Sequence, residues 1–341
     1  MVDGDQWIRV RTSEMTQIKE PKMKRNAILI LLVLAGLVVF SRPGFSQQPK
    51  TVTMARTTGS IGMVPLEFSV NRGYFKRQGL DVQLVTVRQS DVIIAATVSG
   101  ELNFMDIIPT AILASMRGLP IRTIAVVLKS APYVLVGQSN LQSPSELKGK
   151  KIGVSSVGGM SAYLVREIIT RSGLNPDRDV TFLAIGGTSA RSAALVGGTI
   201  DAALVVAPEN YALERKGYRR LLVASDYVNY PLSGVAASAD FLAKNRALAV
   251  SFLKALGEGA RFVRQNKSDS LNFIKGYLKV PDDEAEKSYD FLIKEMPQDL
   301  IPEDAVVRAG MDFARSALKL APEAVPDISK VRDWSFAEAA R

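Results

Sequence analysis

The sequence lacks two residue types on which much enzyme chemistry depends: none of its 341 residues is a cysteine or a histidine. The absence of cysteine excludes disulfides and thiolate nucleophiles. The absence of both excludes Cys/His zinc sites, Ser-His-Asp triads and imidazole acid–base catalysis. We therefore expect a protein that is not an enzyme, with no metal site and no cofactor.

A concentrated basic surface is also missing, although the formal net charge is +9. Part of this charge lies in the N-terminal segment, and the other Lys and Arg residues are scattered, without interleaved aromatic residues. Nucleic-acid binding is therefore not expected. The length and the 47% hydrophobic content instead predict a large core divided between two domains.

A run of about fourteen apolar residues, Ala27–Phe40, lies near the N-terminus, after Met23-Lys24-Arg25 and before Arg42-Pro43-Gly44. It is shorter than the ~20 residues that span a bilayer, so residues 1–46 are interpreted as a cleavable signal peptide ending near Ser46, with a retained anchor as the alternative. Lipid attachment would need a cysteine. We expect a soluble periplasmic protein that is not a lipoprotein, with residues before Met23 added by a start codon placed too early.

Strand and helix patterns alternate from Thr51 onward. The expected strands are 51–56, 81–87, 102–105 and 121–128, and the helices between them are 63–72, 90–100, with Ser90 as cap, and 110–117. Such a succession predicts an α/β fold, with a mostly parallel sheet covered by helices on both faces.

The same order returns about 98 residues later. Asp81-Val82 is echoed by Asp179-Val180, and residues 98–103 by residues 196–201, where a glycine again separates a helix end from a buried strand. A constant offset at two separate places indicates two doubly wound lobes of similar build.

Two stretches, Tyr133–Gln138 and Tyr230–Ser238, are suited to cross between the lobes, and the chain beyond them is helical. We therefore expect lobe 1 to be discontinuous, with residues 51–132 plus 232–341, and lobe 2 to hold residues 133–231. This arrangement predicts a two-strand hinge, a C-terminal helical segment packed on lobe 1, and a cleft between the lobes.

The stretch from Lys150 to Gly173 predicts a strand, a Gly158-Gly159 turn and an amphipathic helix. The free N–H groups at the start of such a helix attract anions. A tight connection without any ligand is the alternative.

One segment carries a family resemblance: Asn71–Val82 reads NRGYFKRQGLDV, similar to the "GYF…GLDV" signature of the nitrate-, sulfonate- and taurine-binding proteins of ABC importers, the SsuA/THI5-like or NMT1 group. Further similar segments are 99–106, 117–120, 145–153 and 198–202. The resemblance implies a type II periplasmic binding fold. It also implies a monomer that captures a small polar organic molecule and delivers it to an ABC permease in the inner membrane.

The resemblance further places the ligand against four loops that follow strands. The residues it implies as contacts are Ser60 and Ile61; Asp106 and Ile107; Ser156, Gly158, Gly159, Met160 and Ser161; and Glu209. Helix capping is the alternative role for Ser60, for Asp106 and, through the helix dipole, for Glu209.

Two carboxylates in one cleft would repel a strongly anionic ligand unless an intervening amine, an ordered cation or Arg191 offsets them. If Asp106 and Glu209 both face the cleft, a zwitterion or a neutral or cationic heterocycle is as good a candidate as nitrate or a sulfonate.

Rival functions remain on the same fold. Pyrimidine synthases similar to this group use histidine and a cysteine-rich motif, which this chain lacks. An enzyme that uses only Asp106 and Glu209 as acid and base, and a ligand sensor without a permease, stay open as alternatives.

Overall fold

The computed structural model describes residues 48–56, 60–87, 89–130, 133–224 and 230–341. The expected signal peptide and the first half of the expected loop around Ser60 lie outside these residues. No helix in the described ranges is long and apolar enough to cross a membrane.

The strands form two five-stranded sheets with the same internal order. The first sheet is β2-β1-β3-β10-β4, built from β1 (Lys50–Arg56), β2 (Leu80–Thr86), β3 (Phe104–Ile107), β4 (Ile121–Leu128) and β10 (Ser233–Ser238). The second is β7-β6-β8-β5-β9, built from β5 (Val134–Gly137), β6 (Lys151–Val154), β7 (Thr181–Ala184), β8 (Ala202–Val205) and β9 (Arg219–Val223). The first sheet with its covering helices is called lobe 1, and the second sheet with its covering helices is called lobe 2.

Both sheets are mostly parallel, as expected, but each contains one antiparallel strand that the sequence did not predict. In each sheet one strand is antiparallel to both its neighbours: β10 runs against β3 and β4, and β5 runs against β8 and β9. These are the two stretches expected to cross between the lobes. Each enters its sheet from the other lobe and therefore runs opposite to the βαβ strands around it.

The internal repeat has a structural basis: the same type of hydrogen bond between strands occurs at the equivalent place in both lobes. Asn103 Oδ1 accepts from the backbone N–H of Thr53 at 2.9 Å in lobe 1, and Asp201 Oδ2 accepts from that of Lys151 at 2.8 Å in lobe 2. The preceding glycines, Gly100 and Gly198, both have positive φ. A polar residue at this place ties a strand edge to its neighbour in both lobes.

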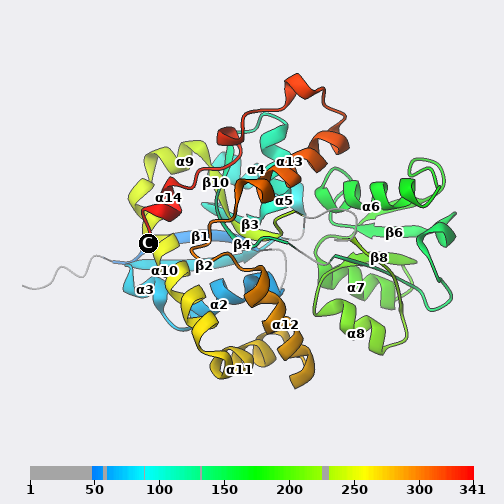
Figure 1. The fold of residues 1–341 in the computed structure, drawn as a ribbon, viewed down its shortest axis with the longest axis horizontal. Coiled ribbons are helices and arrows are strands. Elements are labelled where there is room, and N and C mark those ends of the chain that lie inside the picture. The colour runs from blue at the N-terminus through cyan, green and yellow to red at the C-terminus, as the bar shows by residue number, and fades with distance from the viewer. Residues whose placement is uncertain (1–47, 57–59, 88, 131–132, 225–229) are drawn as a thin grey trace, which may run out of the picture. The chain divides into compact units, whose positions relative to one another are not determined.

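Helices cover both faces of each sheet (Figure 1). In lobe 1 they are η1 (Ile61–Met63), α2 (Val64–Asn71), α3 (Tyr74–Arg77), α4 (Ser90–Ser99) and α5 (Ile108–Met116); in lobe 2 they are η2 (Pro144–Leu147), α6 (Met160–Arg171), α7 (Thr188–Val196) and α8 (Glu209–Arg215). The C-terminal part adds α9 (Ala239–Lys244), α10 (Arg246–Gln265), α11 (Lys267–Leu278), α12 (Asp282–Glu295), α13 (Asp304–Leu318), η4 (Pro322–Ala324), η5 (Ile328–Lys330) and α14 (Ser335–Glu338).

Two details of the expected helices were wrong. Ser90 is the first residue of α4, and Gln89 occupies the capping position, because the Ser90 hydroxyl bonds instead to Ser155 in lobe 2. The sequence pattern also predicts one helix over Leu242–Val263, but the structure divides this stretch into α9 and α10 at Asn245, whose side chain donates a hydrogen bond to the carbonyl of Phe241.

The C-terminal helices pack mainly on lobe 1, as expected. Helix α10 lies against α2 and α3, and its Phe252 meets Phe104 and Phe75 with ring centroids 4.4 and 4.8 Å apart. Burial of these aromatic side chains holds the helical segment to the sheet.

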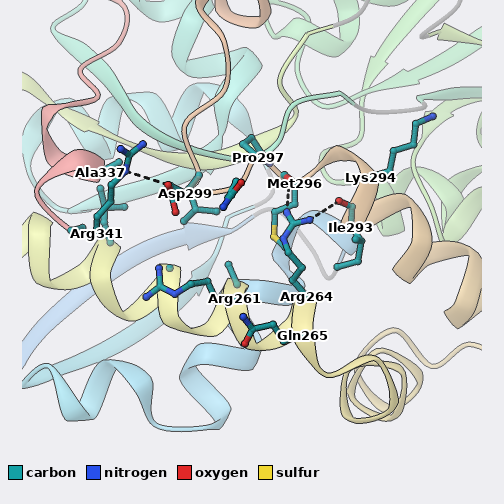
Figure 2. Close-up of a pocket in the computed structure, with 16 residues that line it drawn as sticks. Arg261, Arg264, Gln265, Ile293, Lys294, Met296, Pro297, Asp299, Ala337 and Arg341 are labelled. Atoms are coloured by element: carbon teal, nitrogen blue, oxygen red, sulfur yellow. Dashed lines mark hydrogen bonds and ion pairs between the residues drawn. The ribbon is translucent and has the colours of Figure 1, made fainter.

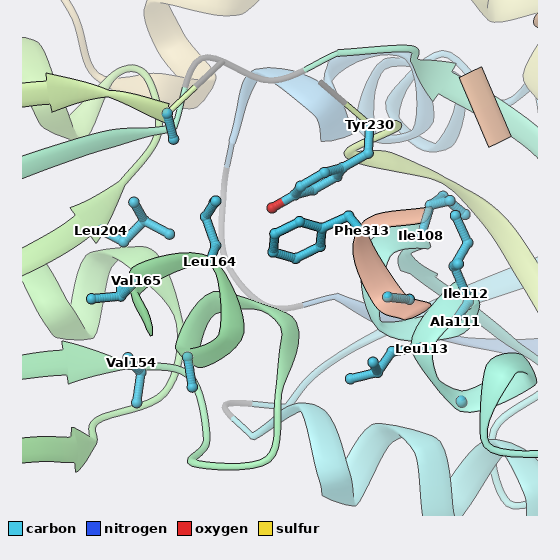
Figure 3. Packing of buried hydrophobic residues seen from close by; sticks show 14 of the residues in the cluster. Ile108, Ala111, Ile112, Leu113, Val154, Leu164, Val165, Leu204, Tyr230 and Phe313 are labelled. Atoms are coloured by element: carbon cyan, nitrogen blue, oxygen red, sulfur yellow. The ribbon is translucent and has the colours of Figure 1, made fainter. Parts of the chain in front are cut away.

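Side chains from both lobes share one hydrophobic cluster (Figure 3). Tyr230 stacks on Phe313 of α13 with centroids 5.4 Å apart, and lobe 2 adds Leu164, Val165 and Leu204 to the cluster. The lobes therefore meet through apolar contacts as well as through the crossing chain.

Candidate functional site

A small cavity of about 50 Å³ lies between the two lobes. Lobe 1 contributes the starts of α4 and α5, and lobe 2 contributes the starts of α6 and α7 with the loops before them. The lining residues are Ser90, Ile107, Pro109, Thr110, Tyr133, Ser155, Ser161, Gly187, Thr188 and Arg191. Most of these residues carry a side-chain hydroxyl group, so both lobes offer hydrogen-bond donors to the cavity.

Arg191 is the only charged side chain in this lining, and it is only 3% exposed. Its Nε donates to the carbonyl of Leu204 at 2.8 Å, Nη1 donates to the carbonyl of Gly186, and Nη2 donates to Thr188 Oγ1 at 3.2 Å. Burial lowers the pKa of Arg191 to about 10, and it remains a cation at neutral pH. Three of its five N–H groups are thus used, and two remain for a ligand.

A chain of serines joins the lobes beside this cavity. Ser90 Oγ donates to Ser155 Oγ at 3.2 Å, and Ser161 Oγ accepts from the backbone N–H of Ser155 at 2.8 Å. The start of α6 is therefore tied both to its own strand and to α4 of lobe 1.

Of the ten residues expected to contact a ligand, Ile107 and Ser161 line the cavity. Ser60 occupies the capping position of η1 without a side-chain capping bond, and Ile61 is buried in the core of lobe 1. The side chain of Met160 lies outside the described part of the structure.

The remaining glycine-turn residues have local roles. The carbonyl of Gly158 accepts from Arg117 Nη2 at 3.2 Å, across the lobes. A Cβ on Gly159 would lie 2.6 Å from Ser156 Oγ, so a larger residue there would force the side chain of Ser156 to move. The hydroxyl of Ser156 is buried without a hydrogen-bond partner among the described groups.

Asp106, in β3, is 5% exposed, and its Oδ1 has no partner among the described groups. Burial raises its pKa to about 7, against the opposing effects of a backbone hydrogen bond and the charge of Arg56. It does not cap α5, because Ile107 occupies that position. The capping alternative for Asp106 was therefore wrong.

Glu209 is the first residue of α8, and its Oε1 accepts from Ser189 Oγ at 2.6 Å, while Oε2 is buried without a partner among the described groups. Burial raises its pKa, and the Ser189 bond and the charge of Arg191 oppose the rise. The charges of Asp106 and Glu209 both raise the pKa of Tyr277, which burial chiefly brings to about 12.

Sequence reasoning named Arg191 as a charge that could offset the two carboxylates, but it did not give Arg191, Thr188 or Tyr133 as ligand contacts, although a signal was present for the first two. Residues 185–190 read IGGTSA and residues 157–162 read VGGMSA. The same strand–glycine–glycine–helix pattern thus occurs twice in lobe 2, and the second copy carries the cationic helix. Tyr133 had no such signal, because it reaches the cavity from the crossing chain.

The described residues contain no group of three or more acidic side chains arranged to hold a metal ion. The site is thus a polar, partly cationic cavity between two lobes, with two carboxyls of raised pKa nearby. Its polar groups suit reversible binding of a small polar molecule, but at about 50 Å³ the cavity is smaller than the range of about 300–1,000 Å³ that is usual for small-molecule sites, so an organic ligand requires the lobes to move apart.

Comparison with known proteins extends this description. Residues 63–269 match the family described as NMT1/THI5 like. The chain is 26% identical over 286 residues to the riboflavin-binding protein RibY of Chloroflexus aurantiacus, covering 81% of this chain and 77% of that protein. It is 25% identical to the 4-amino-5-hydroxymethyl-2-methylpyrimidine phosphate synthase THI13 of Saccharomyces cerevisiae, covering 63% of this chain and 66% of the yeast protein.

Among solved structures, the alkanesulfonate-binding protein SsuA of Xanthomonas axonopodis pv. citri, bound to MOPS, superposes with a TM-score of 0.67 at 18% identity. The match covers 84% of this chain and 99% of that one. The fold is that of the periplasmic binding proteins, which confirms the fold expected from the resemblance. The chain belongs to the NMT1/THI5 like family, because the match spans more than half of its length.

Proposed function

We propose that this protein is a periplasmic solute-binding protein that captures a small polar organic molecule between its lobes and delivers it to an ABC permease in the inner membrane. The observation that carries the proposal is the cavity to which both lobes contribute polar groups, with buried Arg191 at its wall. A ligand that touches both lobes at once stabilises the closed arrangement.

The charges near the cavity narrow the ligand's chemistry. Arg191 offers N–H donors to an anionic or carbonyl group, whereas Asp106 and Glu209 favour an amine or a ring N–H. A molecule with both kinds of group, such as a zwitterion or a polar heterocycle, satisfies the site better than a simple anion. RibY is named for riboflavin and SsuA for alkanesulfonates, so similarity to these proteins does not decide which class of ligand this chain binds.

An enzymatic function is the second candidate, favoured by the likeness to the yeast synthase. It would rest on Asp106, whose pKa of about 7 suits a general acid or base. The complete lack of histidine and cysteine leaves such an enzyme with few other groups for catalysis.

A thermal-shift screen tests the proposal, with sulfonates, nitrate, amino acids, polyamines, pyrimidines, flavins and aromatic acids as candidate ligands. Mass action predicts that a ligand at about 100 times its Kd stabilises the folded protein by about 2.7 kcal/mol. Thr188→Val, which removes a hydroxyl from the cavity and the acceptor of Arg191 Nη2, should raise the Kd of that ligand and lower the melting temperature of the free protein only modestly. Turnover of a compound, rather than reversible binding, would favour the enzyme.

A further inference from the structure

A second pocket, of about 410 Å³, lies within lobe 1 among its C-terminal helices (Figure 2). Its walls are one side of α10, the end of α12 with the segment that follows it, and the C-terminal turn. Its volume lies in the range of about 300–1,000 Å³ that is usual for small-molecule sites. None of its lining residues belongs to the cavity between the lobes.

The floor of this pocket is apolar and combines large with small side chains. The buried residues are Leu253, Ala260, Met296, Leu300, Ala337 and Ala340. Gly257, in the middle of α10, has no side chain and so leaves space in the pocket. A glycine inside a helix lowers stability by about 0.5–1 kcal/mol relative to alanine. Packing does not require it, because an added Cβ would meet only the tip of Arg261, at 3.4 Å.

Some of the charged side chains at the pocket already have hydrogen-bond or ion-pair partners within the protein, and others do not. Arg264 donates to the carbonyls of Ile293 at 3.2 Å and Met296 at 2.6 Å, which ties the end of α12 to α10. Asp299 is paired with Arg341 at 3.3 Å. The acidic side chain of the lining is therefore already neutralised.

Arg261 forms no hydrogen bond or ion pair with any described residue, and Figure 2 shows its guanidinium beside the open space. Lys294 points away from the pocket. A free guanidinium above an apolar floor matches a ligand with one anionic group on an apolar body.

We propose that this pocket is a second binding site, distinct from the interlobe cavity, for a small organic anion: a carboxylate or sulfonate attached to an apolar group. The anionic group pairs with Arg261, and the apolar body occupies the space that Gly257 leaves open. Because the site lies within lobe 1, its occupant stabilises that lobe without bridging to lobe 2.

The experiment is a fluorescence titration of the purified protein with 8-anilinonaphthalene-1-sulfonate, an anion with apolar rings. Arg261→Gln should weaken binding roughly tenfold, as loss of a charged hydrogen bond predicts. Gly257→Leu should abolish it by filling the pocket. Gly257→Ala should retain binding and raise the melting temperature.

Two controls locate the probe. Lys254→Gln removes a positive charge from the same helix outside the pocket, and Thr188→Val alters the interlobe cavity; both should bind the probe like the parent protein. Equal binding by all variants, no binding by the parent, or loss in Thr188→Val alone would overturn the proposal. Melting curves of each variant exclude unfolding as the cause of a loss.

Discussion

Asp106 makes stability depend on pH in a direction opposite to that of most acidic residues. Its folded-state pKa of about 7 lies above its ordinary value of 3.8. The folded protein therefore binds this proton more tightly than the unfolded chain. The resulting stability is complete below the unfolded pKa and is lost as the pH rises from about 4 to 7, at most about 4 kcal/mol.

Asp106→Asn should remove this dependence. Urea unfolding at pH 4.5, 6 and 8 measures the free energy of unfolding of both proteins. From pH 4.5 to 8 this free energy should fall further in the parent protein than in the variant. A bound cationic ligand should make the difference between the two proteins smaller. A constant difference between the two proteins at all three pH values would show that Asp106 stays ionised.

Glu209 offers a test of the ligand's charge. Glu209→Gln keeps the side chain's shape and the acceptor for Ser189 but removes the negative charge. If the ligand carries an amine at this side of the site, its Kd should rise roughly tenfold while the melting temperature of the free protein stays constant or rises. Calorimetry measures both quantities. An unchanged Kd would show that Glu209 does not contact the ligand and that its role is to interact favourably with the dipole of α8.

Single residues were the hardest features to predict from the sequence. The resemblance supplied loops but not side chains, because the residues that line a cavity depend on how two separate lobes meet. Arg191 shows this: the repeated glycine-glycine-helix pattern marks its segment, but its importance comes from burial beside Gly186 and Thr188 at the lobe boundary.

At the scale of elements, polar contacts join the helical layers of the two lobes. Arg215 of α8 forms an ion pair with Glu284 of α12, and Arg117 after α5 donates to Tyr163 of α6 at 3.0 Å. Glu284 is 4% exposed, so separating it from Arg215 leaves a buried charge without its partner. These contacts should favour the closed arrangement of the lobes.

Arg215→Gln should therefore shift the lobes toward the open form. We expect a roughly fivefold faster dissociation of the ligand, a modest value because Arg215 is half exposed and solvent screens the pair. Stopped-flow measurements give this rate, with Lys216→Gln, the next residue along, as the matched control. Equal dissociation rates for Arg215→Gln and Lys216→Gln would exclude the pair as a clamp.

The elements themselves were largely predictable. Strand and helix positions follow from hydrophobic periodicity, and the repeat indicated two similar lobes, as Asn103 and Asp201 confirm with equivalent bonds. Strand direction was not predictable in the same way. The sequence indicated that the stretches of β5 and β10 cross between the lobes, but nothing in their local pattern reveals that they run antiparallel to their neighbours.

At the scale of the whole molecule, the account depends on ligand-driven closure of two lobes. The lack of cysteine makes this directly measurable, because two introduced cysteines become the only sites for spin labels. Val98 and Val196 suit this purpose: they end equivalent helices in lobes 1 and 2 and are 39% and 44% exposed.

The most direct test is the distance between labels at Val98→Cys and Val196→Cys, measured by double electron–electron resonance with and without the ligand found by screening. The account predicts a broad distribution in the free protein that becomes shorter and narrower when the ligand saturates the site. An unchanged distribution at saturation would contradict it.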